Sequence, residues 1–172
     1  MKLLRTPEER FKRICVSNTT LPIGKGTPSQ AFLSWRVFSQ KSPEFDISKI
    51  INNASLRTLE PEELAAYNTP FPDDSYKAGA HIFPSLVPTD LNDLAVTANL
   101  KAWEVLSAWK RSFMTAFSDS DPTTRGWDAY FQKKIPGAKG IRHMTLEYAG
   151  HFVQADKGEA WARIIVKFIR DT

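Results

Sequence analysis

The stretch SFMTAFSDSDP, residues 112–122, combines a strand pattern with a turn pattern, and the other elements are predicted on either side of it. Its apolar start predicts a buried strand over 112–117, and SDSDP predicts a polar turn directly after it. Upstream, apolar residues at helical spacing between Leu91 and Trp109 predict a long amphipathic helix. Downstream, the patterns predict a helix over about 124–133, a strand over 141–148 and a helix over about 158–170.

The chain before residue 91 has a different texture. RICVSN, residues 13–18, is a short β-branched run that predicts a further buried strand. From Thr19 to about Pro88 the sequence is irregular and contains most of the prolines. Short helices are predicted at 29–38 and 61–67, and prolines exclude regular helix from 70–76. Because strands alternate with helices elsewhere, we predict an α/β fold of about three parallel strands with flanking helices.

Composition narrows the class of protein. The 172 residues are 42% hydrophobic and 24% charged, as in an ordinary globular domain. The single cysteine, Cys15, excludes a disulfide framework and fits a reducing compartment, so we expect a cytoplasmic protein. The sequence has no apolar run long enough for a bilayer and no signal-peptide pattern, so we expect no membrane partner. The net charge of +4 comes from scattered basic residues, so we expect no nucleic-acid partner.

Two polar groups follow predicted strands at the edge where α/β sheets bind ligands. Asp121, with Asp119 beside it, follows the strand ending at Phe117, and His151 follows the strand ending near Tyr148. A carboxylate that accepts the Nδ1 proton of a histidine orients the ring as a general base. By spacing alone, a turn-capping aspartate and a structural histidine remain the simpler interpretation.

A nucleophile is missing from this constellation. None of the eight glycines forms a G-x-S-x-G elbow around a Ser, Cys or Asp, and none forms a phosphate-binding loop. The three histidines include no pair at metal-ligand spacing. We therefore expect neither a metal nor a cofactor.

Several longer stretches carry a specific resemblance. They are AFLSWRVFSQKSPEF (31–45), AAYNTPFPDDSYKAGAHIFPSLVP (65–88), FMTAFSDSDP (113–122), FQKKIPGAKG (131–140) and AGHFVQADKGE (149–159). Together they resemble the haloalkane dehalogenases, the α/β-hydrolases whose nucleophile is an aspartate. The resemblance implies the C-terminal part of an α/β-hydrolase fold plus a helical cap. The implied organisation is an N-terminal remnant (1–12), a core strand (13–18), the cap (19–90) and the rest of the core (91–172).

The resemblance also implies roles for individual residues. His151 corresponds to the base that activates water against an alkyl-enzyme ester, and Asp121 matches its supporting acid in preference to Asp119. Trp35 matches a tryptophan whose indole N–H stabilises the leaving halide, although a plain core aromatic is the alternative. A small apolar halogenated substrate would occupy a cavity, whose implied lining could equally be cap packing: Phe32, Phe83, Pro84, Leu86, Val87 and Phe152.

The sequence departs from the family at its nucleophile. In the family, five strands, an oxyanion-hole loop and a Q-D-W-G-G elbow precede the segment that begins here at RICVSN, and this chain has none of them. LRTPEERF, residues 4–11, resembles the extreme N-terminus of the family. This combination predicts a member with an internal deletion that joins near 9–11.

Three function hypotheses remain open at this point. The first is the family reaction, hydrolysis of a carbon–halogen bond to alcohol and halide, impaired here by the missing nucleophile. The second is a non-catalytic remnant that self-associates or pairs with a full-length relative through the exposed edge of strand 13–18. The third is an epoxide-hydrolase-like activity in which Tyr67 and Tyr76 of the cap protonate the ring oxygen. We expect the isolated chain to be inactive and marginally stable.

Overall fold

The computed structural model describes residues 10–172. Strand β1 (Ile14–Val16) comes first, and four α-helices follow it ahead of α6 (Val96–Ala108). They are α2 (Gln30–Lys41), α3 (Ile47–Asn53), α4 (Pro61–Asn68) and α5 (Ala78–Ile82). The remaining elements are α6 (Val96–Ala108), β2 (Phe113–Ser118), α7 (Trp127–Lys134), β3 (Met144–Leu146) and α8 (Val153–Asp171). Single 3-10 turns occur at Asp74–Lys77, Phe83–Leu86 and Pro136–Ala138.

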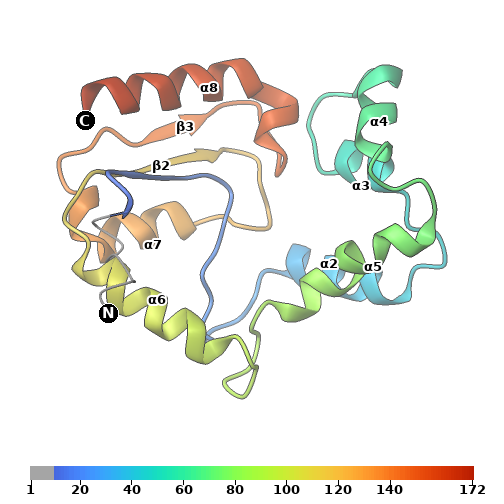
Figure 1. Cartoon of the computed structure of the whole chain (residues 1–172), viewed down its shortest axis with the longest axis horizontal. Coiled ribbons are helices and arrows are strands. Elements are labelled where there is room, and N and C mark those ends of the chain that lie inside the picture. The colour runs from blue at the N-terminus through green and yellow to red at the C-terminus, as the bar shows by residue number, and fades with distance from the viewer. Residues whose placement is uncertain (1–9) are drawn as a thin grey trace.

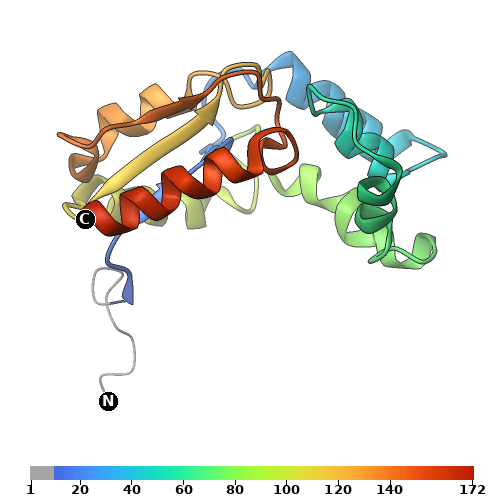
Figure 2. The same cartoon turned by 90° about the horizontal axis from the view of Figure 1, so that it is seen from above.

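The strands form a parallel sheet in the order β1-β2-β3, which confirms the predicted α/β class. Ile14 pairs with Phe113, and Ala116 pairs with Met144. Helices α7 and α8 cover opposite faces of the sheet (Figure 2). Strand β2 is therefore the central strand, whereas β1 pairs on one side only within residues 10–172.

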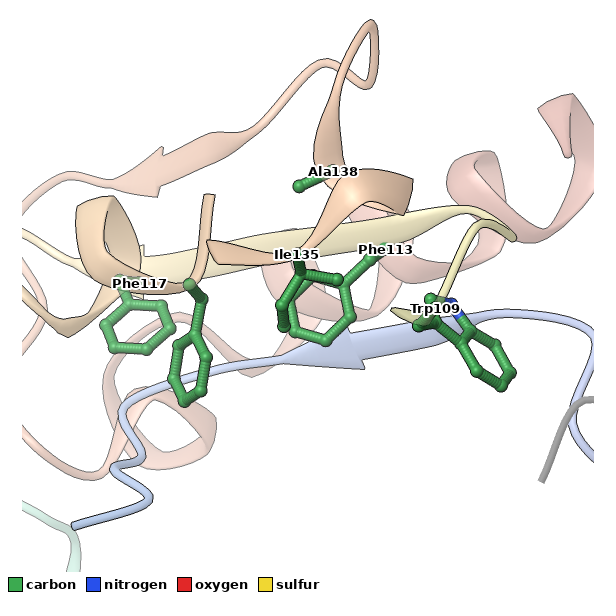
Figure 3. Close-up of a cluster of buried hydrophobic side chains, with 6 residues drawn as sticks. Trp109, Phe113, Phe117, Ile135 and Ala138 are labelled. Atoms are coloured by element: carbon green, nitrogen blue, oxygen red, sulfur yellow. The ribbon is translucent and has the colours of Figure 1, made fainter. Parts of the chain in front are cut away.

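Alternation along β2 supplies a separate core for each face, because successive side chains of a strand point to opposite sides. Phe113 and Phe117 pack toward α7 with a cluster that Figure 3 shows: Trp109, Phe131, Ile135 and Ala138. Met114 and Ala116 pack toward α8 with another: Leu146, Ala149, Val153 and Phe168. The sheet is thus anchored on both faces by buried apolar side chains.

Helices α2 to α5 gather at one end of the molecule, beyond the carboxyl ends of β2 and β3 (Figure 1). Ser29 caps α2 by accepting a hydrogen bond from the Phe32 N–H at 3.2 Å. Glu60 and Glu63 form a capping box at the start of α4. An aromatic cluster joins α2 to α5, because Phe45 stacks on both Trp35 and His81.

Several element boundaries differ from the sequence predictions, and β3 covers only Met144–Leu146 of the predicted 141–148. Helix α6 begins at Val96, not near residue 91, because Asp93 accepts hydrogen bonds from the backbone N–H groups of Thr89 and Asp90 and so favours a turn. Helix α7 begins at Trp127, after Gly126 with φ of 86°. Helix α8 reaches back to Val153 but is interrupted at Lys157, where φ is −137° and ψ is 33°.

Residues 1–9 lie outside the described residues, and with them most of the predicted N-terminal remnant and its junction. Between residues 10 and 172, no helix is both long and apolar enough to cross a bilayer.

Candidate active site

The His151 and Asp121 side chains are in direct contact. His151 Nδ1 lies 3.0 Å from Asp121 Oδ2, although the residues are 30 positions apart in sequence. The carboxylate comes from the turn after β2, and the imidazole from the loop after β3. Parallel strands bring both turns to one edge of the sheet.

Asp121 is held by several donors in a buried position. Its side chain is 1% exposed, whereas that of His151 is 31% exposed. The Thr123 N–H donates to Oδ1 at 2.8 Å, and the Thr124 hydroxyl donates to Oδ2. Burial acts to raise the pKa of Asp121, but the hydrogen bonds from His151 and Thr124 outweigh it and lower that pKa below the usual value. The carboxylate therefore stays ionised beside the ring.

The Asp119 side chain binds the backbone and not the His151 ring. It is exposed, and its carboxylate accepts the Tyr148 N–H at 3.0 Å and the Ala149 N–H at 3.3 Å. These bonds hold the end of β3 against the turn after β2. Asp121, not Asp119, is the aspartate that contacts His151.

Asn18, a residue that the sequence analysis did not single out, ties the two loops together at the end of β1. Its side-chain N–H₂ donates to the carbonyls of Gly150 (3.0 Å) and His151 (2.8 Å), and to the Ser118 hydroxyl (2.8 Å). Its oxygen accepts the Ser118 N–H at 2.9 Å. Asn18 also has a positive φ of 38°, which asparagine tolerates better than most residues. The rule that drew attention to Asp121, a polar residue at the carboxyl end of a strand, applies equally to Asn18.

A cavity of about 590 Å³ opens between the cap and the sheet. His151 lines it from the sheet side. From the cap, the predicted lining residues that reach it are Phe32, Trp35, Phe83, Pro84 and Val87. Among the described residues, its polar lining consists of hydroxyl, amide, imidazole, indole and basic groups, without any carboxylate. The cavity can thus hold an apolar molecule beside His151, but offers it no carboxylate nucleophile.

Two predicted lining residues lie elsewhere. Leu86 is 58% exposed, because the 3-10 turn that buries Pro84 directs Leu86 outward. Phe152 is absent from the lining and instead packs edge-on against the His151 ring, with centroids 5.2 Å apart. Tyr67 and Tyr76 also lie outside the lining, and Tyr76 is 61% exposed.

The part of the chain that the structure describes offers no metal site, since no three His, Cys, Asp or Glu side chains converge there.

Comparisons with known proteins point to one family. No family model matches the sequence. A haloalkane dehalogenase of Psychrobacter cryohalolentis is 44% identical over 171 residues, which are 99% of this chain and 56% of that protein. Haloalkane dehalogenase 1 of Mycobacterium tuberculosis is 37% identical over 164 residues. The chain is a homologue of the haloalkane dehalogenases.

Solved structures of haloalkane dehalogenases agree with this assignment. The tetrameric DpaA of Paraglaciecola agarilytica superposes with a TM-score of 0.77 and 31% identity, over 91% of this chain and 52% of that one. DbeA of Bradyrhizobium elkani gives a TM-score of 0.75 at 20% identity, which shows the fold alone. The chain spans about half the length of the curated dehalogenases it matches. Its strands and helices fit the C-terminal part of an α/β-hydrolase fold.

Proposed function

We propose that this chain carries the acid–base half of a haloalkane dehalogenase site, which serves hydrolysis of a carbon–halogen bond to alcohol and halide. The observation that supports the proposal most is the 3.0 Å contact of His151 Nδ1 with the buried Asp121 carboxylate, at the wall of a cavity that the cap lines with aromatic and apolar side chains. A tyrosine-assisted epoxide reaction is less favoured, because neither Tyr67 nor Tyr76 reaches the cavity.

Each group has a task in the proposed reaction. Asp121 accepts the Nδ1 proton, which leaves Nε2 of His151 free to take a proton from water. That water would attack an alkyl-enzyme ester and release the alcohol. Trp35 would donate its indole N–H to the departing halide from the cap wall. Forming the ester requires a carboxylate that displaces the halide, and the cavity walls described here contain none.

The isolated chain is therefore expected to bind halide without turning over substrate. Purified chain mixed with 1,2-dibromoethane should release bromide no faster than buffer, with the Psychrobacter relative as the positive control. Bromide should quench the tryptophan fluorescence of the chain, and W35F should remove most of the saturable part. W161F is the matched control, because Trp161 donates to Ser17 away from the cavity. Turnover by the isolated chain, or equal quenching in W35F, would contradict the proposal.

The free edge of β1 favours a second candidate function, association with a partner that completes the sheet. Strand β1 pairs only with β2 within the described residues, and an unpaired edge is a template for another strand. Helices α6 and α8 also expose apolar side chains, among them Leu100, Val105, Val166 and Ile169. We propose as partner the portion of a dehalogenase relative that this chain does not match, because it would bring a nucleophile.

Co-expression tests this association. The chain should co-purify with the unmatched portion of the Psychrobacter relative, and the complex should release bromide from 1,2-dibromoethane. A pair of copies of this chain alone would support association without the completing role, and a dilute monomer in both preparations would refute the candidate. A cytoplasmic location belongs to the same proposal and rests on the single cysteine.

A further inference from the structure

We infer that Asp156 is a positioning residue for His151 and that it couples the histidine loop to the cap. The inference deepens the proposed function and rests on it for the role of His151. Nothing in the acid–base geometry itself requires Asp156, which lies five positions beyond the histidine.

The Asp156 carboxylate joins two segments that are far apart in sequence. Its Oδ1 accepts the backbone N–H groups of Leu56 and Arg57, each at 3.0 Å. Its Oδ2 accepts the Gly150 N–H at 2.7 Å and also lies 3.0 Å from the Leu56 nitrogen. Leu56 and Arg57 belong to the cap, between α3 and α4, whereas Gly150 directly precedes His151. A single side chain thus binds the cap and the histidine loop at once.

Two further bonds run between the same segments. The His151 N–H donates to the Ala54 carbonyl at 2.9 Å, and Arg57 Nε donates to the Ala155 carbonyl at 2.6 Å. Arg57 is itself fixed by Glu63 of α4, with Nη1 2.7 Å from Oε2. We call residues 54–57 and 150–156 together the cap latch.

Gly150 shows how closely the two halves of the cap latch approach. A Cβ at this position would lie 2.5 Å from the Ala54 carbonyl oxygen and 3.3 Å from Asp156 Oδ2. The first distance is too short for any side chain, so this close approach requires glycine at residue 150.

The cap latch acts on His151 from the side opposite to Asn18. Asn18, from the sheet, holds the carbonyls of Gly150 and His151. The Ala54 carbonyl of the cap holds the His151 N–H, and Asp156, which is itself bound to the cap, holds the Gly150 N–H. With both backbone sides fixed, the imidazole keeps Nδ1 on Asp121. Loss of the Asp156 carboxylate would free the cap side, and the ring would then sample positions away from Asp121.

The conservative variant D156N tests this positioning. The amide keeps the size of the carboxylate, but it presents an N–H₂ group to backbone donors. We expect hydrogen exchange at the Gly150, His151 and Leu56 amides to accelerate at least tenfold. In histidine-labelled protein, we expect the Nδ1–H signal of His151 to weaken by more than half, while the His143 signals stay in place. H151Q assigns the signal.

The control is D74N, since the Asp74 side chain is 93% exposed in the cap and, within residues 10–172, its carboxylate pairs with Lys77 alone. It should change neither measurement. R57A, which removes the bond to Ala155 from the cap side, should change the His151 signal in the same direction as D156N and keeps the inference testable if D156N does not fold.

A lower melting temperature in D156N with an unchanged His151 signal would show a purely structural role and overturn the inference. If the unmodified chain lacks the Nδ1–H signal, the proposed acid–base pair fails instead. The exchange rates at Gly150 and Leu56 would still report whether Asp156 joins the two segments.

Discussion

Asp121 shows how a buried carboxylate can remain charged in this fold. Its side chain is nearly inaccessible, yet three donors surround it: the Thr123 N–H, the Thr124 hydroxyl and His151 Nδ1. Removing the acceptor leaves these donors without a partner in a place that water reaches poorly, so the cost exceeds that of an ordinary hydrogen bond.

We expect D121A to lower the free energy of unfolding by about 2 kcal/mol for this reason. Urea denaturation followed by circular dichroism measures the loss. D74A, at an exposed aspartate, should change it by less than about 0.5 kcal/mol. Equal effects in the two variants would show that the donors around Asp121 find other partners.

The lowered pKa of Asp121 gives its stabilisation a definite pH window. The native pKa lies below that of the unfolded chain, about 3.9 for aspartate, so the contribution is complete above that value. It is lost as the pH falls through the lower native pKa. The difference in unfolding free energy between the unmodified chain and D121N should therefore shrink as the pH falls below about 4. A difference that grows on acidification would contradict this sign.

The pKa of Cys15 is shifted in the opposite direction from that of Asp121, because burial raises it to about 11. The thiol is neutral at pH 8, and since the thiolate is the reactive form, native chain should react with iodoacetamide at least tenfold more slowly than chain in 8 M urea. Mass spectrometry of timed samples measures the ratio. Equal rates would mean that β1 opens readily in solution.

At the scale of elements, close backbone approaches decide which glycines matter. A Cβ on Gly137 would lie 1.9 Å from the Arg111 carbonyl oxygen, in the turn that joins α7 to β3. Gly158, within α8, has no atom within 4 Å of its Cβ position. A side chain at residue 137 would therefore clash with the backbone, whereas a side chain at residue 158 would have room.

We expect G137A to unfold the chain or to lower its melting temperature by several degrees, whereas G158A should be neutral or stabilising by up to about 1 kcal/mol. Thermal denaturation of the two variants in parallel measures the contrast. Matching losses would argue that helix entropy, not the Arg111 contact, governs both positions.

The sequence predicts the strands and the final helix well because their patterns are local. The apolar run of β2 and the apolar stripe of α8 reflect cores that lie directly against them. Boundaries are less predictable where side chains compete with the backbone, as Asp93 does before α6. The seven-residue helix α3 was missed because so short a segment has little periodicity.

The candidate site is predictable only in part from the sequence. Asp121 and His151 follow from their place after strands, together with the family resemblance. Asn18 binds backbone groups up to 133 residues away, and Asp156 joins Gly150 to backbone groups 99 and 100 residues away. No local pattern reports such distant contacts. Leu86 lies outside the cavity lining, which leaves cap packing as the interpretation for it, because sequence alone does not fix which way a 3-10 turn faces.

At the scale of the whole molecule, one sheet carries two separate cores. Because β2 contributes side chains to both cores, a substitution that destabilises one core should also destabilise the other. Phe117 is 5% exposed in the α7 cluster, and F117A is expected to remove 3–5 kcal/mol. That is comparable to the whole stability of a marginal domain.

F117A should therefore abolish the near-ultraviolet dichroism of the chain, including the signal of Trp161 on the α8 face. The comparison is L94A, because Leu94 is 100% exposed. A variant that loses order only around α7 would show that the two faces fold independently.

The insertion of the cap between β1 and β2 has a kinetic consequence. Contacts between the ends of β1 and β2 span 100 residues, whereas Thr115 of β2 contacts His143, before β3, across 28. The longer loop has the larger closure entropy, and such distant pairings slow the search for the native topology. Refolding should begin with the compact segment from β2 to α8, and β1 should dock last. During that interval the Ser118 side of the sheet lacks Asn18, so the loop bearing His151 acquires its final shape only in the closing phase of folding.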